Sequence, residues 1–204
     1  MTYTTAALFT LAAQCAPNVS QQTVVAIIKT ESGGNPFAIN VNGARQPPAP
    51  TSAASAAATA RRFIAAGYSV DLGLGQINSR NMRWLGLTWN TVFDPCTNIS
   101  AGAKVLTHGY QKTGSLPAAL SMYNTGKPNS TRGQEYARQV LRHAGVVVPA
   151  PAGGRMANLP ALKVETRRDP TAPESTAAAA PSATLEPISV AVSPQASDFS
   201  PSWR

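Results

Sequence analysis

The sequence predicts a mainly α-helical domain over residues 1–145, followed by a disordered tail over residues 146–204. Helical spacing and helix-capping residues recur up to Gly145, whereas strand signals are weak throughout. After Gly145 the composition changes, and nine of the seventeen prolines fall in a stretch rich in Ala, Ser and Thr. Nothing in that stretch has a period that could bury an apolar face, so we expect it to be disordered.

Local signals place the helices of the domain in order. Ser20 is a predicted N-cap, Gly33 ends the same helix, and Asp94 followed by proline marks the start of another. Thr131 and Gln134 match a capping box for the last helix. The first segment has no basic n-region, so we interpret it as a helix of the fold rather than a signal peptide. The expected helices cover about 5–14, 20–32, 52–67, 81–85, 95–114, 115–126 and 131–145.

Charge is distributed unevenly between the two parts of the chain. The net charge is +8, and the domain holds twelve Lys and Arg against four acids, whereas the tail holds five of each. A basic domain indicates an anionic partner. There is no Lys/Arg run and no basic-aromatic interleaving, so nucleic acid is not the expected partner. No apolar stretch approaches the roughly 18 residues of a membrane-spanning helix. Two His without a Cys-x-x-Cys pair argue against a zinc site, and we expect neither a metal nor another cofactor.

Glu31 is the first candidate for catalysis. It follows Val24, Ile27 and Ile28 at helical spacing, which places its carboxyl on the inward stripe in the last turn of the helix. Desolvation and the negative end of the helix dipole both raise a carboxyl pKa, as a general acid requires. The alternative is a glutamate that turns out to solvent where the helix frays.

Two further segments carry polar side chains beside glycines. Residues 71–78 read Asp-Leu-Gly-Leu-Gly-Gln-Ile-Asn, and the amides of Gln76 and Asn78 can line a sugar site because an amide both donates and accepts. A dinucleotide fingerprint would need a third glycine where Asn78 stands. The alternative is a purely structural turn. Tyr123 lies three residues after Leu120 and is expected to point inward, where a tyrosine is more often core than catalytic.

Taken together, three segments resemble a known family. Glu-Ser-Gly-Gly-Asn-Pro at 31–36, Gly-Leu-Gly-Gln-Ile-Asn at 73–78 and Met-Tyr-Asn-Thr-Gly at 122–126 resemble, in order and spacing, the three signatures of the soluble lytic transglycosylases. Within that family the chain is most similar to the small murein-cleaving enzymes encoded with type IV secretion systems, over about residues 15–145. It departs from the family pattern at Gly75, where many members have Met, and at Thr125, where many have Ala.

The resemblance implies a lysozyme-like helical domain, an α+β superfold with little sheet, in which Glu31 is the single acid and base. Glu31 would protonate the glycosidic oxygen between N-acetylmuramic acid and N-acetylglucosamine, then accept the proton of the muramoyl 6-hydroxyl as a 1,6-anhydro ring closes. The implied substrate-binding residues are Ser32, Gln76, Asn78, Tyr123 and Asn124. The tyrosine of the third signature is expected to orient the glutamate.

The small number of acids tests this mechanism. Ordinary glycosidases use two carboxyl groups. In the domain, Asp94 is a predicted N-cap and Glu135 lies in the first turn of the last helix, so only Asp71 is left as a partner for Glu31. A lysozyme-type hydrolase that uses water and Asp71 is therefore the main alternative. A wall-binding module without catalysis and a basic module that binds nucleic acid are the others.

Cys15 and Cys96 complete the resemblance to this subgroup. A bridge between them would tie the first helix to the helix that starts at Pro95, whereas reduced thiols are expected if the protein stays in the cytosol. Murein as substrate favours the disulfide and a periplasmic location, although the sequence shows no convincing export signal. The expected partners are murein glycan strands and components of a type IV secretion apparatus.

Overall fold

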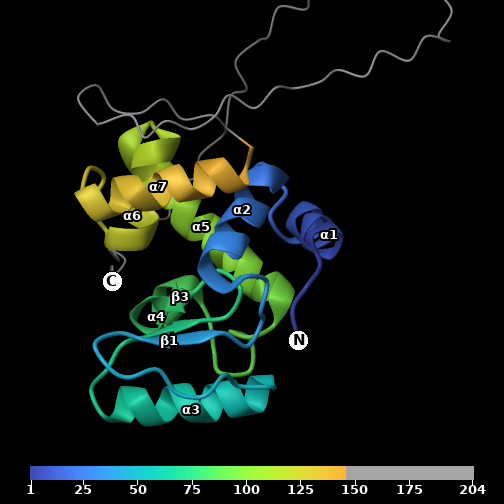
Figure 1. Cartoon of the computed structure of the whole chain (residues 1–204), viewed down its shortest axis with the longest axis vertical. Helices are drawn as coiled ribbons and strands as arrows, with labels where there is room; N and C mark the ends of the chain where they lie inside the picture. The colour runs from blue at the N-terminus through green and yellow to red at the C-terminus, as the bar shows by residue number, and fades with distance from the viewer. Residues whose placement is uncertain (146–204) are drawn as a thin grey trace, which may run out of the picture. The chain divides into compact units, whose positions relative to one another are not determined.

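The computed structural model describes residues 1–145, and the predicted tail lies outside the described residues. The described part is mainly helical with one small sheet, as the sequence predicted (Figure 1). The helices are α1 (Thr5–Cys15), α2 (Gln21–Ser32), α3 (Ala53–Ala65), α4 (Met82–Leu85), α5 (Pro95–Thr113), α6 (Leu116–Thr125), α7 (Thr131–His143) and the 3-10 turn η1 (Ser79–Asn81). No helix among residues 1–145 is long and apolar enough to span a membrane.

Most helix ends lie where the capping residues predicted them. The Asp94 carboxylate accepts a hydrogen bond from the Thr97 backbone N–H at 2.8 Å, and Gly33 ends α2 in the left-handed conformation. The capping box predicted at Thr131 is wrong by one residue. Ser130 is the N-cap of α7, and its hydroxyl accepts from the Gly133 N–H at 3.2 Å.

Three short strands form an antiparallel sheet in the order β1 (Ile39–Val41), β2 (Val70–Leu72) and β3 (Ile77–Asn78). Asn40 is opposite Asp71, which in turn is opposite Asn78. These polar side chains therefore lie in one row across the sheet. In Figure 1 the sheet, α3 and α4 lie together at one end of the domain, below α6 and α7.

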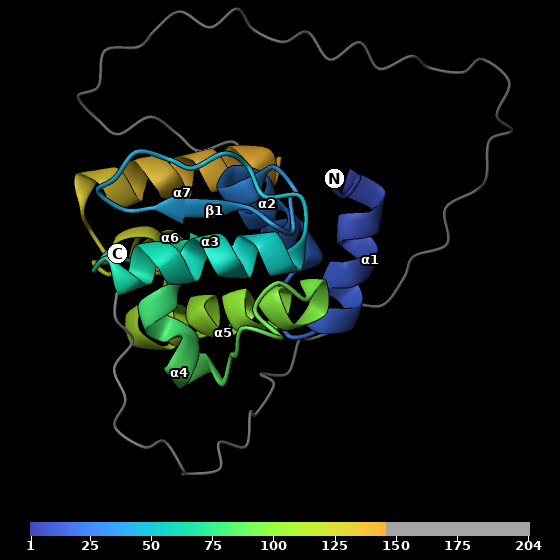
Figure 2. The same ribbon diagram turned by 90° about the horizontal axis from the view of Figure 1, so that it is seen from below.

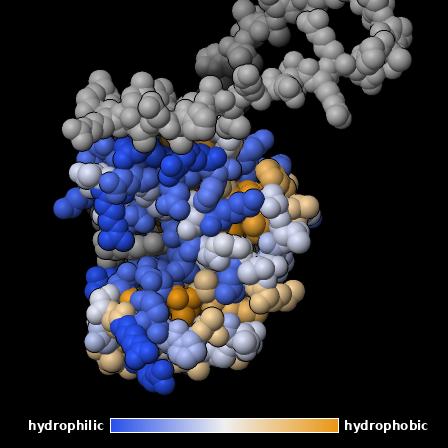
Figure 3. All heavy atoms as spheres, in the orientation of Figure 1, coloured by the Kyte–Doolittle hydropathy of each residue, from blue (hydrophilic) through white to orange (hydrophobic). Residues whose placement is uncertain are grey.

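The core has two clusters of buried apolar side chains. One joins the sheet and α3 to α5, α6 and α7, and its members include Leu72, Val92, Leu120 and Val140. The other packs α1 on α2 and includes Leu74 and Ile99. Figure 2 shows α1 crossing the end of α5. On the face drawn in Figure 3, hydrophilic side chains predominate over α7, whose outer side carries Arg132 and Arg142.

Candidate active site

Glu31 lies in the last turn of α2. Val24, Ile27 and Ile28 are buried on the same stripe, and the Glu31 side chain is half-buried at its end. Two positive-φ glycines then turn the chain away, and the Gly34 carbonyl accepts a hydrogen bond from the Tyr3 N–H at 2.9 Å. The helix therefore ends at the carboxyl group, and the segment before α1 contacts the turn that follows it.

A tyrosine that the sequence did not single out for the site holds this carboxyl group. The Tyr136 hydroxyl of α7 donates a 2.8 Å hydrogen bond to Glu31 Oε1. Tyr136 is buried, and a phenol can enter a core only where its hydroxyl has a partner. Tyr136 therefore fixes the orientation of the Glu31 carboxyl group.

Tyr123 of α6 contacts Tyr136 and thereby supports its position beside the Glu31 carboxyl group. Its ring stacks on that of Tyr136, with centroids 6.3 Å apart and planes 3° apart. Its hydroxyl donates to the Gly75 carbonyl oxygen at 2.7 Å. Tyr136, rather than the tyrosine of the third signature, donates this hydroxyl bond to Glu31, and the orienting role expected of Tyr123 stays a prediction.

The side chain of Asn98 in α5 supports the loop between β2 and β3 through hydrogen bonds. The Asn98 side chain accepts from the Gly75 N–H at 2.8 Å and donates to the Leu72 and Val92 carbonyls at 3.0 and 2.7 Å. A Cβ at Gly73, which has a φ of +73°, would collide with the same amide. One buried asparagine thus sets the path of the second signature.

Gln76 lies in this loop and Asn78 at the end of β3, and both buried side chains bind other groups of the protein. Gln76 has a φ of +48° and donates through Nε2 to the Gly73 carbonyl at 2.9 Å and the Ala38 carbonyl at 3.2 Å. Asn78 donates to Asp71 Oδ1 at 2.7 Å and accepts from the Arg80 N–H at 3.1 Å. These bonds shape the turn.

Asp71 is 1% exposed and is surrounded by amide groups. Asn78 binds its Oδ1, while Asn40 and Asn42 donate to its Oδ2 at 3.2 and 3.1 Å. Three amide groups thus donate hydrogen bonds to this buried carboxylate. The carboxylate thereby joins β1, β2 and β3 on the face where the three strands meet.

Ser32 and Asn124 differ in their bonding. The Ser32 hydroxyl donates to the Ile28 carbonyl and accepts from the Gly34 N–H, both at 3.2 Å, so it closes the end of α2. Asn124 is 9% exposed in the last turn of α6, and its side chain makes no hydrogen bond to another residue of 1–145. Of the predicted substrate-binding amides, Asn124 is thus the one without an internal hydrogen bond.

The predicted disulfide is present. Cys15, the last residue of α1, is bonded to Cys96 in the first turn of α5, 81 positions later, with the two Cα atoms 5.1 Å apart. The bond joins the two helices that cross in Figure 2.

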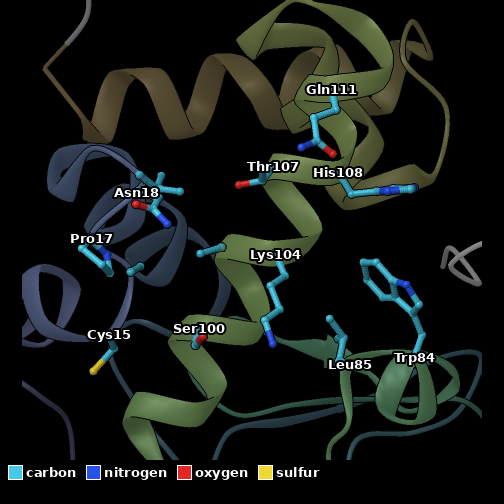
Figure 4. A pocket seen from close by; sticks show the side chains of 13 residues that line it. Cys15, Pro17, Asn18, Trp84, Leu85, Ser100, Lys104, Thr107, His108 and Gln111 are labelled. Atoms are coloured by element: carbon cyan, nitrogen blue, oxygen red, sulfur yellow. The ribbon is translucent and has the colours of Figure 1, made fainter. Parts of the chain in front are cut away.

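A groove of about 480 Å³ runs along the outer side of α5, from Ser100 to Gln111 (Figure 4). The loop between α1 and α2 forms one wall. On the other, Trp84 lies edge-on to the His108 ring at 5.4 Å. Burial, and secondarily the Lys112 charge, lower the pKa of His108. Glu31 does not line this groove.

The profile of the transglycosylase SLT domain matches residues 9–143. The chain belongs to this family. The SLT match covers Glu31, Tyr123 and Tyr136, and thus every helix that contributes to the arrangement around the carboxyl group. No solved structure matches the chain at a significant level.

Relatives of this SLT chain are named virB1. It is 39% identical over 153 residues to the type IV secretion system protein virB1 of Brucella abortus biovar 1, covering 67% of this chain and 63% of the relative. It is 38% identical over 149 residues to protein virB1 of Rhizobium radiobacter, covering 69% and 62%. The chain thus spans less than two thirds of the length of these relatives.

Proposed function

We propose that this chain is a lytic transglycosylase that cuts murein between N-acetylmuramic acid and N-acetylglucosamine. The observation that carries the proposal is the Glu31 carboxyl group, oriented by the Tyr136 hydroxyl at the end of a buried helix stripe. Membership of the SLT family supports the same reaction class.

The reaction needs one carboxyl group. Glu31 donates its proton to the glycosidic oxygen, which leaves as the 4-hydroxyl of N-acetylglucosamine. The muramoyl O6 then bonds to C1, and its proton returns to the Glu31 carboxylate. No water is consumed, and the product ends in 1,6-anhydro-N-acetylmuramic acid. Ser32, Gln76, Asn78, Tyr123 and Asn124 shape the site, with Asn124 in direct contact with the sugar.

The other acids of the domain favour this route over hydrolysis. Asp71, the candidate second carboxylate, accepts three amide hydrogen bonds at 1% exposure. Asp94 caps α5, and Glu135 is exposed on α7. A retaining or inverting hydrolase would need one of them within about 5–9.5 Å of Glu31 and facing the sugar.

The names of the relatives support a proposal about where in the cell such an enzyme acts. A murein-cutting enzyme that resembles virB1 proteins would open the wall locally in the periplasm for a type IV secretion apparatus. We further propose that residues 1–145 form the catalytic domain.

Mass spectrometry of digested murein tests the reaction. We expect fragments with anhydro ends, which are one water lighter than reducing ends. Glu31→Gln should abolish them, whereas the matched variant Glu135→Gln, at an exposed carboxyl, should retain them. Reducing ends from the unaltered chain would instead establish a hydrolase. An active Glu31→Gln variant would remove the assigned acid.

A further inference from the structure

The sheet end of the domain contains a second hollow, of about 610 Å³, between the end of α3 and residues 79–89. Its lining combines aromatic and basic side chains: Tyr68, Arg80, Arg83 and Trp89, with Ile64, Met82 and Leu87 beneath them. Glu31, Tyr123 and Tyr136 are on α2, α6 and α7 and do not line it.

Positive charge gathers around this hollow. Four of the twelve Lys and Arg of the domain, namely Arg61, Arg62, Arg80 and Arg83, lie on its lining or beside it, and no acid lines it. Within residues 1–145, Arg61, Arg62 and Arg80 form no ion pair. In Figure 3 strongly hydrophilic side chains lie over α3, next to small hydrophobic ones. The hollow therefore attracts anions.

The aromatic rings hold two of these arginines in place. The Arg61 guanidinium lies over the Trp89 ring, 5.1 Å from its centroid. The Arg62 guanidinium lies 5.6 Å from the centroid of Phe63, and that ring meets Tyr68 edge-on at 6.1 Å. Tyr68 is 40% exposed. These stacked guanidinium groups keep two positive charges beside the hollow, and the exposed Arg80 on its lining offers a planar fork that can bind a carboxylate.

From this arrangement we infer that the hollow binds the peptide stems of murein through their carboxylates. The inference rests on the proposed function, since murein supplies carboxylate-bearing stems at regular intervals along each glycan strand. Arg80, which is exposed on the lining, binds a stem carboxylate, and the exposed ring of Tyr68 contacts the adjoining apolar part of the glycopeptide. This hollow, which Glu31 does not line, thus retains the enzyme on strands that carry peptide stems.

Binding assays in the full chain with Glu31→Gln, which prevents turnover, test the inference. The probes are purified glycan strands with stems intact and the same strands stripped of stems by an amidase. We expect Arg80→Gln to weaken binding to intact strands about tenfold, the value for a charge-assisted hydrogen bond. Binding to stripped strands should stay within about twofold. Arg132→Gln, at an exposed arginine of α7, is the matched control.

Further variants and probes decide the remaining outcomes. Arg80→Lys keeps the charge but loses the fork, so we expect an intermediate affinity, and binding equal to that of the unaltered residue would overturn the inference. Equal loss on stripped strands would overturn it as well. A single-stranded oligodeoxynucleotide that binds as tightly as intact strands, and loses that binding in Arg80→Gln, would reassign the hollow to nucleic acid.

The experiments distinguish failure of the proposed transglycosylase function from failure of the stem site. If the unaltered chain yields no anhydro ends while Arg80→Gln still loses stem-dependent binding, the stem site stands and the transglycosylase proposal falls. If anhydro ends form and Arg80→Gln binds both kinds of strand normally, the stem site falls alone.

Discussion

The Tyr136 hydroxyl donates to Glu31 Oε1 at 2.8 Å across 105 positions of the sequence, joining the last helix to the end of the second. The ring of Tyr136 is in turn stacked on Tyr123, whose hydroxyl is bound to the Gly75 carbonyl. The orientation of the Glu31 carboxyl group therefore depends on α6, α7 and the loop between β2 and β3 together.

We expect Tyr136→Phe to lower kcat about tenfold with little change in KM, because the ring stack survives and only the bond to Glu31 is lost. The pH profile of kcat should also shift, since the carboxyl group loses a donor. Turnover of soluble glycan strands over a pH series measures both. Tyr110→Phe, at a half-exposed tyrosine, is the control. An unchanged profile would contradict the orienting role of Tyr136.

Asp71→Asn should destabilise the domain by about 3 kcal/mol. The new amide presents an NH2 group to donors that now bind a carboxylate, so buried N–H groups lose their acceptor. Urea denaturation at pH 7 measures the difference. Asp94→Asn should change little, because asparagine is as good an N-cap as aspartate. A stable Asp71→Asn variant that yields a different product would revive the hydrolase.

Gly75→Ala should cost about 1–2 kcal/mol of stability, since its Cβ would lie 3.0 Å from the Tyr123 hydroxyl oxygen. Removing that hydroxyl makes room. In a Tyr123→Phe background the same substitution should therefore cost less, and a double-mutant cycle by denaturation measures the coupling. Additive effects would show that the two residues do not compete for space.

Loss of the Cys15–Cys96 bond should reduce stability by about 4 kcal/mol in the chain-entropy model, because it closes a long loop. Thermal unfolding with and without reductant should give clearly different Tm values for the oxidised protein. A Cys15→Ser, Cys96→Ser double variant should be insensitive to reductant. Equal Tm values for the oxidised and reduced protein would contradict a stabilising bond.

His108 should make the domain less stable in mild acid. Burial and Lys112 lower its pKa, so below about pH 6.5 the unfolded chain binds a proton that the folded chain resists. Stability is then lost as the pH falls from 6.5 to the pKa of the folded state, and not further below it. His108→Gln should flatten this fall between pH 7 and 5 in denaturant titrations of the variant and the unaltered protein. Equal slopes would contradict the lowered pKa.

Local signals predicted the helices well, because caps act within one turn. Asp94, Pro95 and Gly33 mark helix ends where the structure has them. At α7 two adjacent hydroxyl residues compete for the N-cap, and the hydroxyl that reaches an N–H three residues later is that of Ser130 rather than Thr131. The strands were missed as separate elements since each has only two or three residues.

The site was predicted less completely for a physical reason. Spacing placed Glu31 on the inward stripe and identified the loop of Gln76 and Asn78, yet it could not show which atoms face one another. The sequence pattern did not single out Tyr136, and the available signal was its hydroxyl, which needs a partner when buried. Which acceptor it meets depends on the packing of α7 against α2, and a sequence pattern does not contain that.

The disulfide between Cys15 and Cys96 affects when the protein reaches its most rigid form. It holds α1 to α5, and the segment before α1 donates from Tyr3 to Gly34, three residues after Glu31. In a reducing compartment this support consists of packing and the Tyr3–Gly34 hydrogen bond, whereas in an oxidising one the disulfide adds a covalent link. A wall-cutting enzyme built in this way would reach its most rigid form only after leaving the cytosol, next to its substrate.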